Sequence, residues 1–343
     1  MIAADSTAMF REAGEAGEAV ARFLAANSNT LARLGKKLRA LQPAVVVTCA
    51  RGSSDHAATY GKYLIETMLG VPVASAAPSV SSVYAAPARA RGTLCIAVSQ
   101  SGRSPDLLAV VDAQKAAGAH VIAFVNDVTS PLAAAADTLL PLEAGPERSV
   151  AATKSYITAL AGFAALVAEW ADDTSLRAAV AGLPDALARA WALPWDGVET
   201  LLQDATNLFV IGRGLGLGIA AEAALKLKET CGLHAEAFSS AEVRHGPMAI
   251  VGPGFPLLAL ATSDLAGDDV RAVATEFASR EARVALADAS QDGAGDTPAL
   301  RAHRAIEPIL MIQSFYRMAN ALSLSRGFNP DSPQHLSKVT RTL

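Results

Sequence analysis

A constant shift of 162 positions brings part of the second half of this chain onto the first half, with no gap over about 75 residues. The matched positions include two glycines and parts of several apolar runs. They are Arg51-Gly52 with Arg213-Gly214, Gly70 with Gly232, Ala97 with Ala259, Ser101 with Ser263, and Ile122-Ala123-Phe124 with Val284-Ala285-Leu286. Solenoid units repeat every 20–50 residues or so, and this repeat is far longer. The sequence therefore predicts two copies of one domain. A chance alignment of two unrelated halves is disfavoured, because so many matches share one offset.

Short apolar runs alternate with longer amphipathic stretches, which is typical of a parallel α/β sheet with strands buried on both faces. The predicted strands are Ala44–Thr48, Leu94–Val98, Val121–Val125 and Thr138–Leu142 in the first half, and Leu208–Ile211, Leu257–Ala261 and Val284–Asp288 in the second. The predicted helices of the first half are His56–Leu69, Pro105–Ala117, Pro131–Ala136 and Lys154–Glu169.

These elements divide the chain into three parts. We expect an N-terminal helical segment over residues 1–40, a first α/β domain over 41–175 and a second over 196–343. The boundary falls within Asp172–Asp196, where acidic residues and two Leu-Pro pairs interrupt the pattern. Near the end, Pro308–Arg326 predicts one long helix that begins at proline, and the polar tail Gly327–Leu343 is expected to be irregular.

Composition excludes several classes of protein. Of the 343 residues, 51% are hydrophobic and 18% charged, which excludes a disordered chain. The net charge of −4, without a basic stripe, argues against nucleic-acid binding. The N-terminus carries acidic residues and no apolar run resembles an export signal or a membrane span, so we expect a cytoplasmic protein. The three cysteines lack metal-site spacing, so we expect free thiols and no metal.

Two loops at strand ends are rich in serine and glycine. The first is Ala50–Ser54; the second is Ser99–Ser104, with Pro105 opening a helix. Backbone N–H groups at helix N-termini bind phosphate well, and serine hydroxyls add donors. Either loop alone is more simply a turn, but together they favour a phosphate site. A third segment, Glu147–Lys154, either contacts a ligand or caps the following helix.

A charged face appears on one helix of the second half. Glu222, Lys226 and Glu229 are spaced i, i+4 and i+7 and therefore share a face. An exposed ion pair is the simplest interpretation. However, the repeat places Leu64 and Thr67 where this helix has Lys226 and Glu229, so the fold itself does not require those charges.

A histidine follows this helix at an irregular corner. His245 precedes Gly246-Pro247, and imidazole is suited to proton transfer near neutral pH. A lone histidine is more often structural than catalytic. No spacing of histidines with other ligands suggests a metal.

Taken together, these motifs resemble the sugar isomerase (SIS) family. The residues that carry the resemblance are Ala223–Glu229 with His245-Gly-Pro, the Ser99-Gln-Ser-Gly loop, Val150–Lys154 and Leu336-Ser337-Lys338. The resemblance covers about residue 30 to 343. It is strongest to the isomerase half of glucosamine-6-phosphate synthases and to SIS-type glucosamine-6-phosphate deaminases. It implies two SIS subdomains, each a parallel sheet flanked by helices, in a homodimer without a cofactor.

The resemblance also implies roles for individual residues. Phosphosugar contacts map onto Ser54, Ser99, Gln100, Ser101, Ser104 and Val150. The catalytic carboxylate maps onto Glu229, with Glu222 and Lys226 as helpers. The ring-opening histidine maps onto His245, which in the synthases comes from the neighbouring subunit. The C-terminal lysine maps onto Lys338. One carboxylate can move a proton between C1 and C2 of an open-chain sugar, so these groups are expected to gather around one substrate.

The sequence also departs from the synthases. They carry an N-terminal glutaminase domain, which this chain does not show, and its ending Lys338-Val339-Thr340-Arg341 differs from theirs. Both departures favour release of ammonia from glucosamine 6-phosphate, giving fructose 6-phosphate. An isomerase or deglycase that acts on another phosphosugar, and a non-enzymatic phosphosugar-binding protein, remain the alternatives.

Overall fold

The computed structural model describes residues 3–338, which form two compact units. Unit 1 contains the N-terminal residues up to Gly17, Glu147–Ile157 and Gly182–Lys338. Unit 2 contains Glu18–Pro146 and Thr158–Ala181. Two helices, α2 (Ala16–Leu41) and α7 (Lys154–Trp170), belong partly to each unit.

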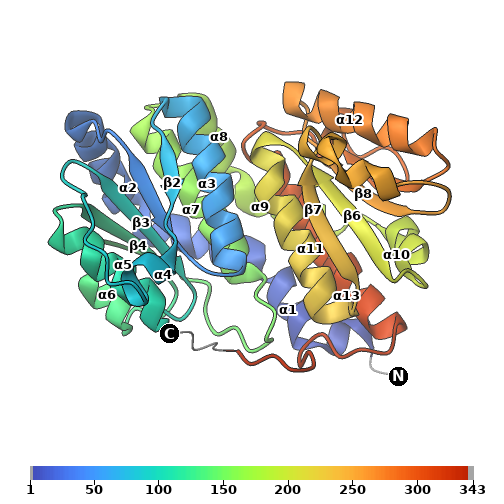
Figure 1. The fold of residues 1–343 in the computed structure, drawn as a ribbon, viewed down its shortest axis with the longest axis horizontal. Helices are drawn as coiled ribbons and strands as arrows, with labels where there is room; N and C mark the ends of the chain where they lie inside the picture. Colours follow the sequence, from blue (N-terminus) through green and yellow to red (C-terminus); the bar gives the residue numbers. More distant parts are fainter. Residues whose placement is uncertain (1–2, 339–343) are drawn as a thin grey trace. The chain divides into compact units, whose positions relative to one another are not determined.

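Unit 2 is built on a five-stranded parallel sheet in the order β2-β1-β3-β4-β5 (Figure 1). The strands are β1 (Val46–Cys49), β2 (Val73–Ser75), β3 (Leu94–Ser99), β4 (His120–Val125) and β5 (Thr138–Pro141). Successive side chains of a strand point to opposite faces, so an all-apolar strand needs cover on both. The helices that provide it are α3 (Ser53–Leu69), α5 (Pro105–Ala116), α6 (Pro131–Ala135) and parts of α2 and α7; α4 (Pro78–Ser82) and α8 (Thr174–Ala181) complete the unit.

The two faces of this sheet have separate cores. On one face, Cys95 and Ala97 of β3 pack with Leu107 and Val111 of α5. On the other face, Phe124 of β4 stacks against Phe163 of α7 with ring centroids 5.1 Å apart. Helix α3 also meets Phe163, at Gly61, where an added Cβ would lie 2.4 Å from the ring. The glycine therefore permits a close helix–helix contact.

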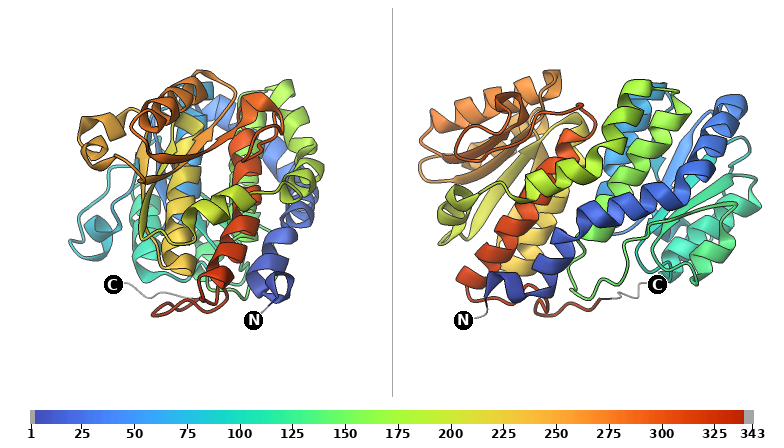
Figure 2. Two further views of the ribbon diagram at one scale, coloured as in Figure 1. Left: turned by 90° about the vertical axis from the view of Figure 1, so that its right-hand side faces the viewer. Right: turned by 180° about the vertical axis from the view of Figure 1, so that it is seen from behind.

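Unit 1 is built on a four-stranded parallel sheet in the order β7-β6-β8-β9. Its strands are β6 (Asn207–Gly212), β7 (His234–Ser239), β8 (Pro256–Ala261) and β9 (Arg283–Asp288). One face packs against α12 (Leu265–Ala278), through residues such as Val270 and Phe277. Helix α11 (Leu217–Cys231) packs against β6 and β7 and against α13 (Glu307–Ser325), which also contacts α1 (Ala8–Gly14), α9 (Leu183–Trp191) and α10 (Asp196–Leu202) (Figure 2).

The predicted fold class and duplication are confirmed. The 162-residue shift carries β3 onto β8 at both bounds. It also carries Gly52 onto Gly214, each with φ of 55°, and Gly70 onto Gly232, with φ of 66° and 63°. The second pair ends α3 and α11 in the left-handed conformation that glycine adopts without steric cost. The two halves thus share helix ends as well as strands.

The sequence interpretation missed β2 and β7. Both are edge strands, and most of the residues of β2 are exposed, so neither carries the continuous apolar pattern of a central strand. The second half also lacks a counterpart of β5 among the described residues, where Asp288 and Pro298 form only an isolated bridge. The long terminal helix is confirmed within one residue at each end, and residues 327–338 are irregular as expected. Residues 339–341 of the predicted tail motif lie outside the described residues.

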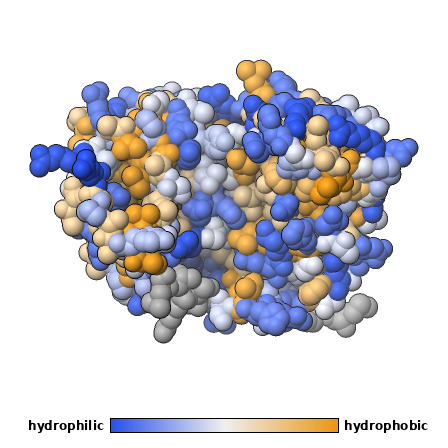
Figure 3. All heavy atoms as spheres, in the orientation of Figure 1, coloured by the Kyte–Doolittle hydropathy of each residue, from blue (hydrophilic) through white to orange (hydrophobic). Residues whose placement is uncertain are grey.

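Across residues 3–338, no helix is both long enough and apolar enough to cross a bilayer. On the face drawn in Figure 3, apolar atoms form separate groups among polar ones. The most exposed large apolar side chains are Leu265, Tyr84, Ile250 and Val83.

Candidate active site

The two predicted phosphate loops lie at a topological switch point of unit 2. From β1 the chain runs to the edge strand β2 and then returns to β3, on the other side of β1. Because β1 and β3 pair in parallel, with Cys49 opposite Ala97, the loops that follow them leave the same edge of the sheet. Ligands of open α/β sheets bind at such points.

The second loop is held in shape from within. The Ser99 hydroxyl accepts a hydrogen bond from the Gly102 backbone N–H at 2.9 Å. Gly102 has φ of 62°, and an added Cβ would lie 2.2 Å from the Ser130 hydroxyl, so only glycine fits. Ser104 occupies the N-cap position of α5, yet its hydroxyl makes no capping bond.

Several polar side chains at this edge keep their hydrogen-bonding capacity. Ser54 lies in the first turn of α3, while Gln100, Ser101 and Ser104 lie on the loop after β3. All four are partly exposed, and their side chains make no hydrogen bond with other described residues. Ser99, by contrast, is buried and serves the loop itself. The edge thus presents hydroxyls, an amide and two helix N-termini to an anion.

Sequence reasoning missed an ion pair that ties the two loops together. Arg51, on the first loop, donates through Nε and Nη2 to one oxygen of Asp106, at 2.8 and 2.5 Å. Asp106 is fully buried in the first turn of α5. The repeat offered a signal, because Arg213 stands at the equivalent position and pairs with Asp269 at 2.7 Å.

The same loop carries a second anchor. Arg103 donates to Asp127 at 2.7 Å, and Thr129 donates to Asp127 through both its hydroxyl and its backbone N–H. The hydrogen bonds from Thr129, followed by that from Arg103, lower the pKa of Asp127 to about 2.

The equivalent switch point of unit 1 is already filled by a carboxylate. Ser263, the counterpart of Ser101, donates its backbone N–H and its hydroxyl to Glu307, at 2.8 and 2.6 Å. Ala302 N–H donates to the same carboxylate at 3.2 Å, and Glu307 is fully buried. Asp264 caps α12 next to it. The donors that stay free at the unit 2 edge are therefore satisfied internally in unit 1.

The predicted acid–base face exists, but it is not an exposed one. Lys226 Nζ lies 2.5 Å from Glu229 Oε2 and 3.3 Å from Glu222 Oε1. Lys226 and Glu222 are buried, whereas the Glu229 side chain keeps 21% of its exposure. Tyr316 of α13 donates its hydroxyl to Glu222 at 3.0 Å. A cation is thus held between two carboxylates, of which only Glu229 reaches solvent.

Burial and charge both act on these groups. Burial by itself would lower the pKa of Lys226, but Glu222 and Glu229 outweigh it, so that pKa is raised. Burial, with the Glu222 charge, raises the pKa of Tyr316 well above its ordinary value. Lys226 therefore remains a cation and Tyr316 a neutral donor. Tyr316 is a further member of this cluster that the sequence did not reveal.

His245 lies apart from these contacts. It is the last residue of a 3-10 turn, Glu242–His245, and it precedes Gly246, which has φ of 142°. Arg244 fixes this turn by pairing with Asp269 at 3.1 Å and Glu276 at 3.2 Å. The imidazole is exposed and makes no hydrogen bond to another described residue. It is available to a substrate or to another chain.

Lys338 lies against the third predicted segment. Its Nζ donates to the Ser149 carbonyl at 2.6 Å and to Glu147 at 3.3 Å. Glu147 also accepts from the backbone N–H groups of Thr153 and Ser155, at 3.0 and 3.2 Å. The capping interpretation of this segment is therefore correct for Glu147. Val150 is half-buried within the same segment.

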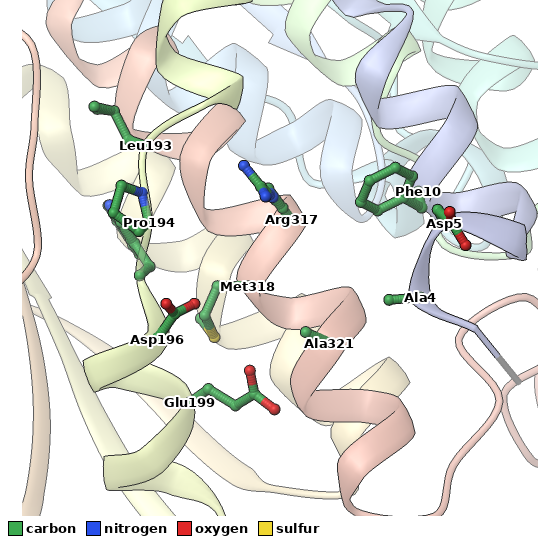
Figure 4. A pocket seen from close by; sticks show the side chains of 11 residues that line it. Ala4, Asp5, Phe10, Leu193, Pro194, Asp196, Glu199, Arg317, Met318 and Ala321 are labelled. Atoms are coloured by element: carbon green, nitrogen blue, oxygen red, sulfur yellow. The ribbon is translucent and has the colours of Figure 1, made fainter. Parts of the chain in front are cut away.

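A pocket of about 310 Å³ lies elsewhere in unit 1 (Figure 4). None of the predicted site residues lines it. Its lining comes from the N-terminal segment, the α9–α10 connection, α10 and α13, through Ala4, Asp5, Phe10, Leu193, Pro194, Trp195, Asp196, Glu199, Arg317, Met318 and Ala321. The described part of the chain holds no group of three or more His, Cys, Asp or Glu side chains suited to a metal ion.

Comparison with known proteins decides the family. The profile of the SIS domain matches residues 42–169 and 201–307, one match in each half. The chain belongs to the SIS domain family. Its two SIS segments correspond to the two copies found in the sequence, and the isomerases among its relatives confirm the prediction of a phosphosugar isomerase-type enzyme.

This chain covers about half of one of its relatives and the whole of another. The glutamine–fructose-6-phosphate aminotransferase (isomerizing) of Aeropyrum pernix is 36% identical over 311 residues, which are 84% of this SIS chain and 49% of the relative. The chain thus spans about half the length of that protein. A solved structure of a candidate phosphosugar isomerase from Silicibacter pomeroyi DSS-3 is 43% identical, with a TM-score of 0.88, covering 95% of this chain and 100% of that one.

A glucosamine-6-phosphate deaminase from Thermotoga maritima shares the fold. Its structure has a TM-score of 0.74 at 22% identity and covers 94% of this chain and 100% of that one. At this identity the likeness concerns the fold alone.

Proposed function

We propose that this SIS protein is an amino-sugar-phosphate isomerase and deaminase, which most simply converts glucosamine 6-phosphate and water into fructose 6-phosphate and ammonia. The observation that carries the proposal is the Glu222–Lys226–Glu229 cluster, with only Glu229 partly exposed. The isomerizing aminotransferase relatives, whose name includes fructose 6-phosphate, support the substrate class.

The phosphate is assigned to the unit 2 edge. Ser54, Ser99, Gln100, Ser101 and Ser104 are its proposed contacts. Val150 is kept as a further proposed substrate contact, on the basis of the family resemblance alone. The hydroxyls of Ser54, Ser101 and Ser104 and the two helix N-termini support this role, because they offer O–H and N–H donors to a dianion, while Ser99 shapes the loop. Anchoring the remote phosphate orients the sugar carbons before the chemistry begins.

Proton transfer is assigned to Glu229. His245 opens the sugar ring by moving a proton to the ring oxygen. Glu229 then removes the proton from C2 of the open-chain aldehyde and returns it to C1, which leaves an imine at C2. Water adds to that imine, and ammonia leaves. Lys226 keeps Glu229 in place, and Glu222 holds Lys226 from the other side. Lys338 assists this exchange in one of two ways: through its charge beside the C2 imine, or by displacing ammonia from C2 to form a lysine imine, which water then hydrolyses to fructose 6-phosphate and the free lysine side chain.

The exposed position of His245 supports a second proposal, that the protein works as a homodimer with His245 supplied to the neighbouring copy. A free imidazole on a turn that Arg244 holds firmly is suited to reach another chain. Size measurement in solution, with mixing of His245→Ala and Glu229→Gln chains, tests this. Hybrid dimers regain one active site if the histidine acts in trans, and stay inactive if it acts within its own chain.

A second candidate is isomerisation of another phosphosugar without loss of nitrogen. The 43% identical relative, described by no particular sugar, supports keeping it. A coupled ammonia assay over the 6-phosphates of glucosamine, mannosamine and galactosamine separates the two, with fructose 6-phosphate and tagatose 6-phosphate as nitrogen-free substrates. Ammonia from one hexosamine, abolished in Glu229→Gln, supports deamination; isomerisation without ammonia supports the alternative. A protein that binds the sugars but turns over none of them would be a sensor.

A further inference from the structure

Glu147 is a buried carboxylate that the mechanism above leaves unused. Its side chain is fully buried, and all its described partners lie in unit 1. Two backbone N–H groups at the start of α7 and the Ser155 hydroxyl, at 2.7 Å, fix its two oxygens. Because these donors belong to a helix N-terminus, the carboxylate has a rigid position.

The chain segment that carries Lys338 is fastened along its length. Asp331 accepts the backbone N–H groups of Ala8 and Met9, at the start of α1, each at 2.7 Å. The Asp331 carbonyl accepts from Val150 N–H at 3.3 Å. The Pro330 carbonyl accepts the Ser149 hydroxyl at 3.4 Å. The irregular tail is thus joined to both α1 and the 147–155 segment.

Helix α1 holds that segment as well. Glu12 accepts the backbone N–H groups of Arg148 and Ser149, at 2.5 and 3.1 Å. Burial raises the pKa of Glu12, although the hydrogen bonds from Arg148 and Ser149 oppose the shift. Three pieces of chain, α1, residues 147–155 and residues 329–338, therefore form one network that ends at the Lys338 ammonium group.

We propose that Glu147 and Asp331 are positioning residues for Lys338. Asp331 fixes where the tail runs, and Glu147 fixes where Nζ lies within it. This inference rests on the proposed role of Lys338 in catalysis. Without Glu147 the ammonium group keeps only the Ser149 carbonyl among its described partners. The position of Nζ is then less well fixed.

A double-mutant cycle tests the proposal on the full chain. Glu147→Gln keeps the shape and an acceptor oxygen, and we expect kcat to fall about 10- to 100-fold with KM little changed. In a Lys338→Ala background the same substitution should cost nothing further, because Glu147 acts through the lysine. Glu143→Gln, an exposed carboxylate four residues earlier, is the matched control. Losses that multiply in the double variant would overturn the proposal.

Hydrogen exchange supplies a readout that does not depend on turnover. In Asp331→Asn and Glu147→Gln, backbone amides of residues 329–338 should lose protection while the two sheets keep theirs. Unchanged protection of the tail in both variants would overturn the proposal. If the wild-type enzyme turns over no sugar phosphate but the tail still loosens, the proposed function fails and the positioning network stands.

Discussion

Lys226 donates a hydrogen bond to Glu229 at 2.5 Å, from a position on α11 that is almost fully buried. Side chains three residues apart on a helix meet routinely, but a buried cation needs compensation for its lost hydration. Here Glu222 and Glu229 supply it together. The buried Lys226 therefore fixes the position of Glu229, the proposed proton carrier, and the pair is not an ordinary surface ion pair.

Removing that cation should disturb both stability and catalysis. In Lys226→Met, Glu222 stays buried and loses its ion pair with Lys226, and breaking such a pair typically costs about 3–5 kcal/mol of unfolding free energy. Urea unfolding measures the loss, and kcat should fall in parallel. A variant as stable as the wild type would show that the cluster contributes no net stabilisation.

The same lysine predicts a pH dependence. Its folded-state pKa lies above 10.5, so the stabilisation from its pairing is fully present below pH 10.5 and is lost as the pH rises through the folded value. The difference in unfolding free energy between wild type and Lys226→Met should be constant from pH 7 to 10 and shrink above it. A difference that shrinks towards acid pH in the range 6–8 would contradict this sign.

Tyr316→Phe isolates the hydrogen bond to Glu222. The substitution leaves a buried carboxylate oxygen with one donor fewer, which costs about 1–3 kcal/mol. Tyr316 bonds to Glu222, whereas Glu229 bonds to Lys226. We therefore expect the substitution to lower stability more than kcat. Thermal unfolding and steady-state kinetics on the same sample make the comparison. An unchanged unfolding temperature would show that the hydrogen bond from Tyr316 to Glu222 does not stabilise the protein.

Phosphate binding should involve one half of the duplication only. Glu307 already accepts the hydrogen bonds of Ser263, whereas Ser101 has no such acceptor within residues 3–338. Equilibrium dialysis with inorganic phosphate should therefore find one site per chain. Ser101→Ala should abolish that binding and Ser263→Ala should leave it. Two sites, or loss in the Ser263 variant alone, would contradict the assignment.

The Arg51–Asp106 pair should affect substrate affinity. Asp106→Asn weakens the link between the two phosphate loops, so KM for the sugar phosphate should rise about tenfold, a change of roughly 1.4 kcal/mol, with kcat largely retained. Asp127→Asn provides a comparison, because it loosens Arg103 on the same loop without touching that link. Equal KM values for Asp106→Asn and wild type would show that the pair does not order the site.

The sequence predicted those parts of the fold that depend on residues close together in the chain. Periodicity locates buried strands and their helices, and the repeat predicts shared glycines such as Gly52 and Gly214, because their backbone conformations recur. It failed for β7, an edge strand that lacks a continuous apolar pattern. The charged face of α11 was found from spacing, but its burial was not, since burial depends on α13, which lies about 90 residues later.

Long-range partners explain the rest of what was missed. Tyr316, Glu147 and Asp331 acquire their roles from contacts across large sequence separations, which no local pattern records. Arg51 could be predicted in part. The repeat matches it with Arg213, but nothing in the sequence indicated its partner Asp106. The roles of Ser54, Ser99, Gln100, Ser101, Ser104 and Val150 stay predictions.

The central claim is that Glu229 moves a proton between neighbouring carbons of a phosphosugar, and exchange with solvent deuterium tests it most directly. With glucosamine 6-phosphate or fructose 6-phosphate in D₂O, the wild-type protein should incorporate deuterium at the carbon that Glu229 reprotonates, and Glu229→Gln should incorporate none at a comparable rate while still binding the sugar. Incorporation at the wild-type rate in Glu229→Gln, or none in the wild type with any phosphosugar that binds, would contradict the account.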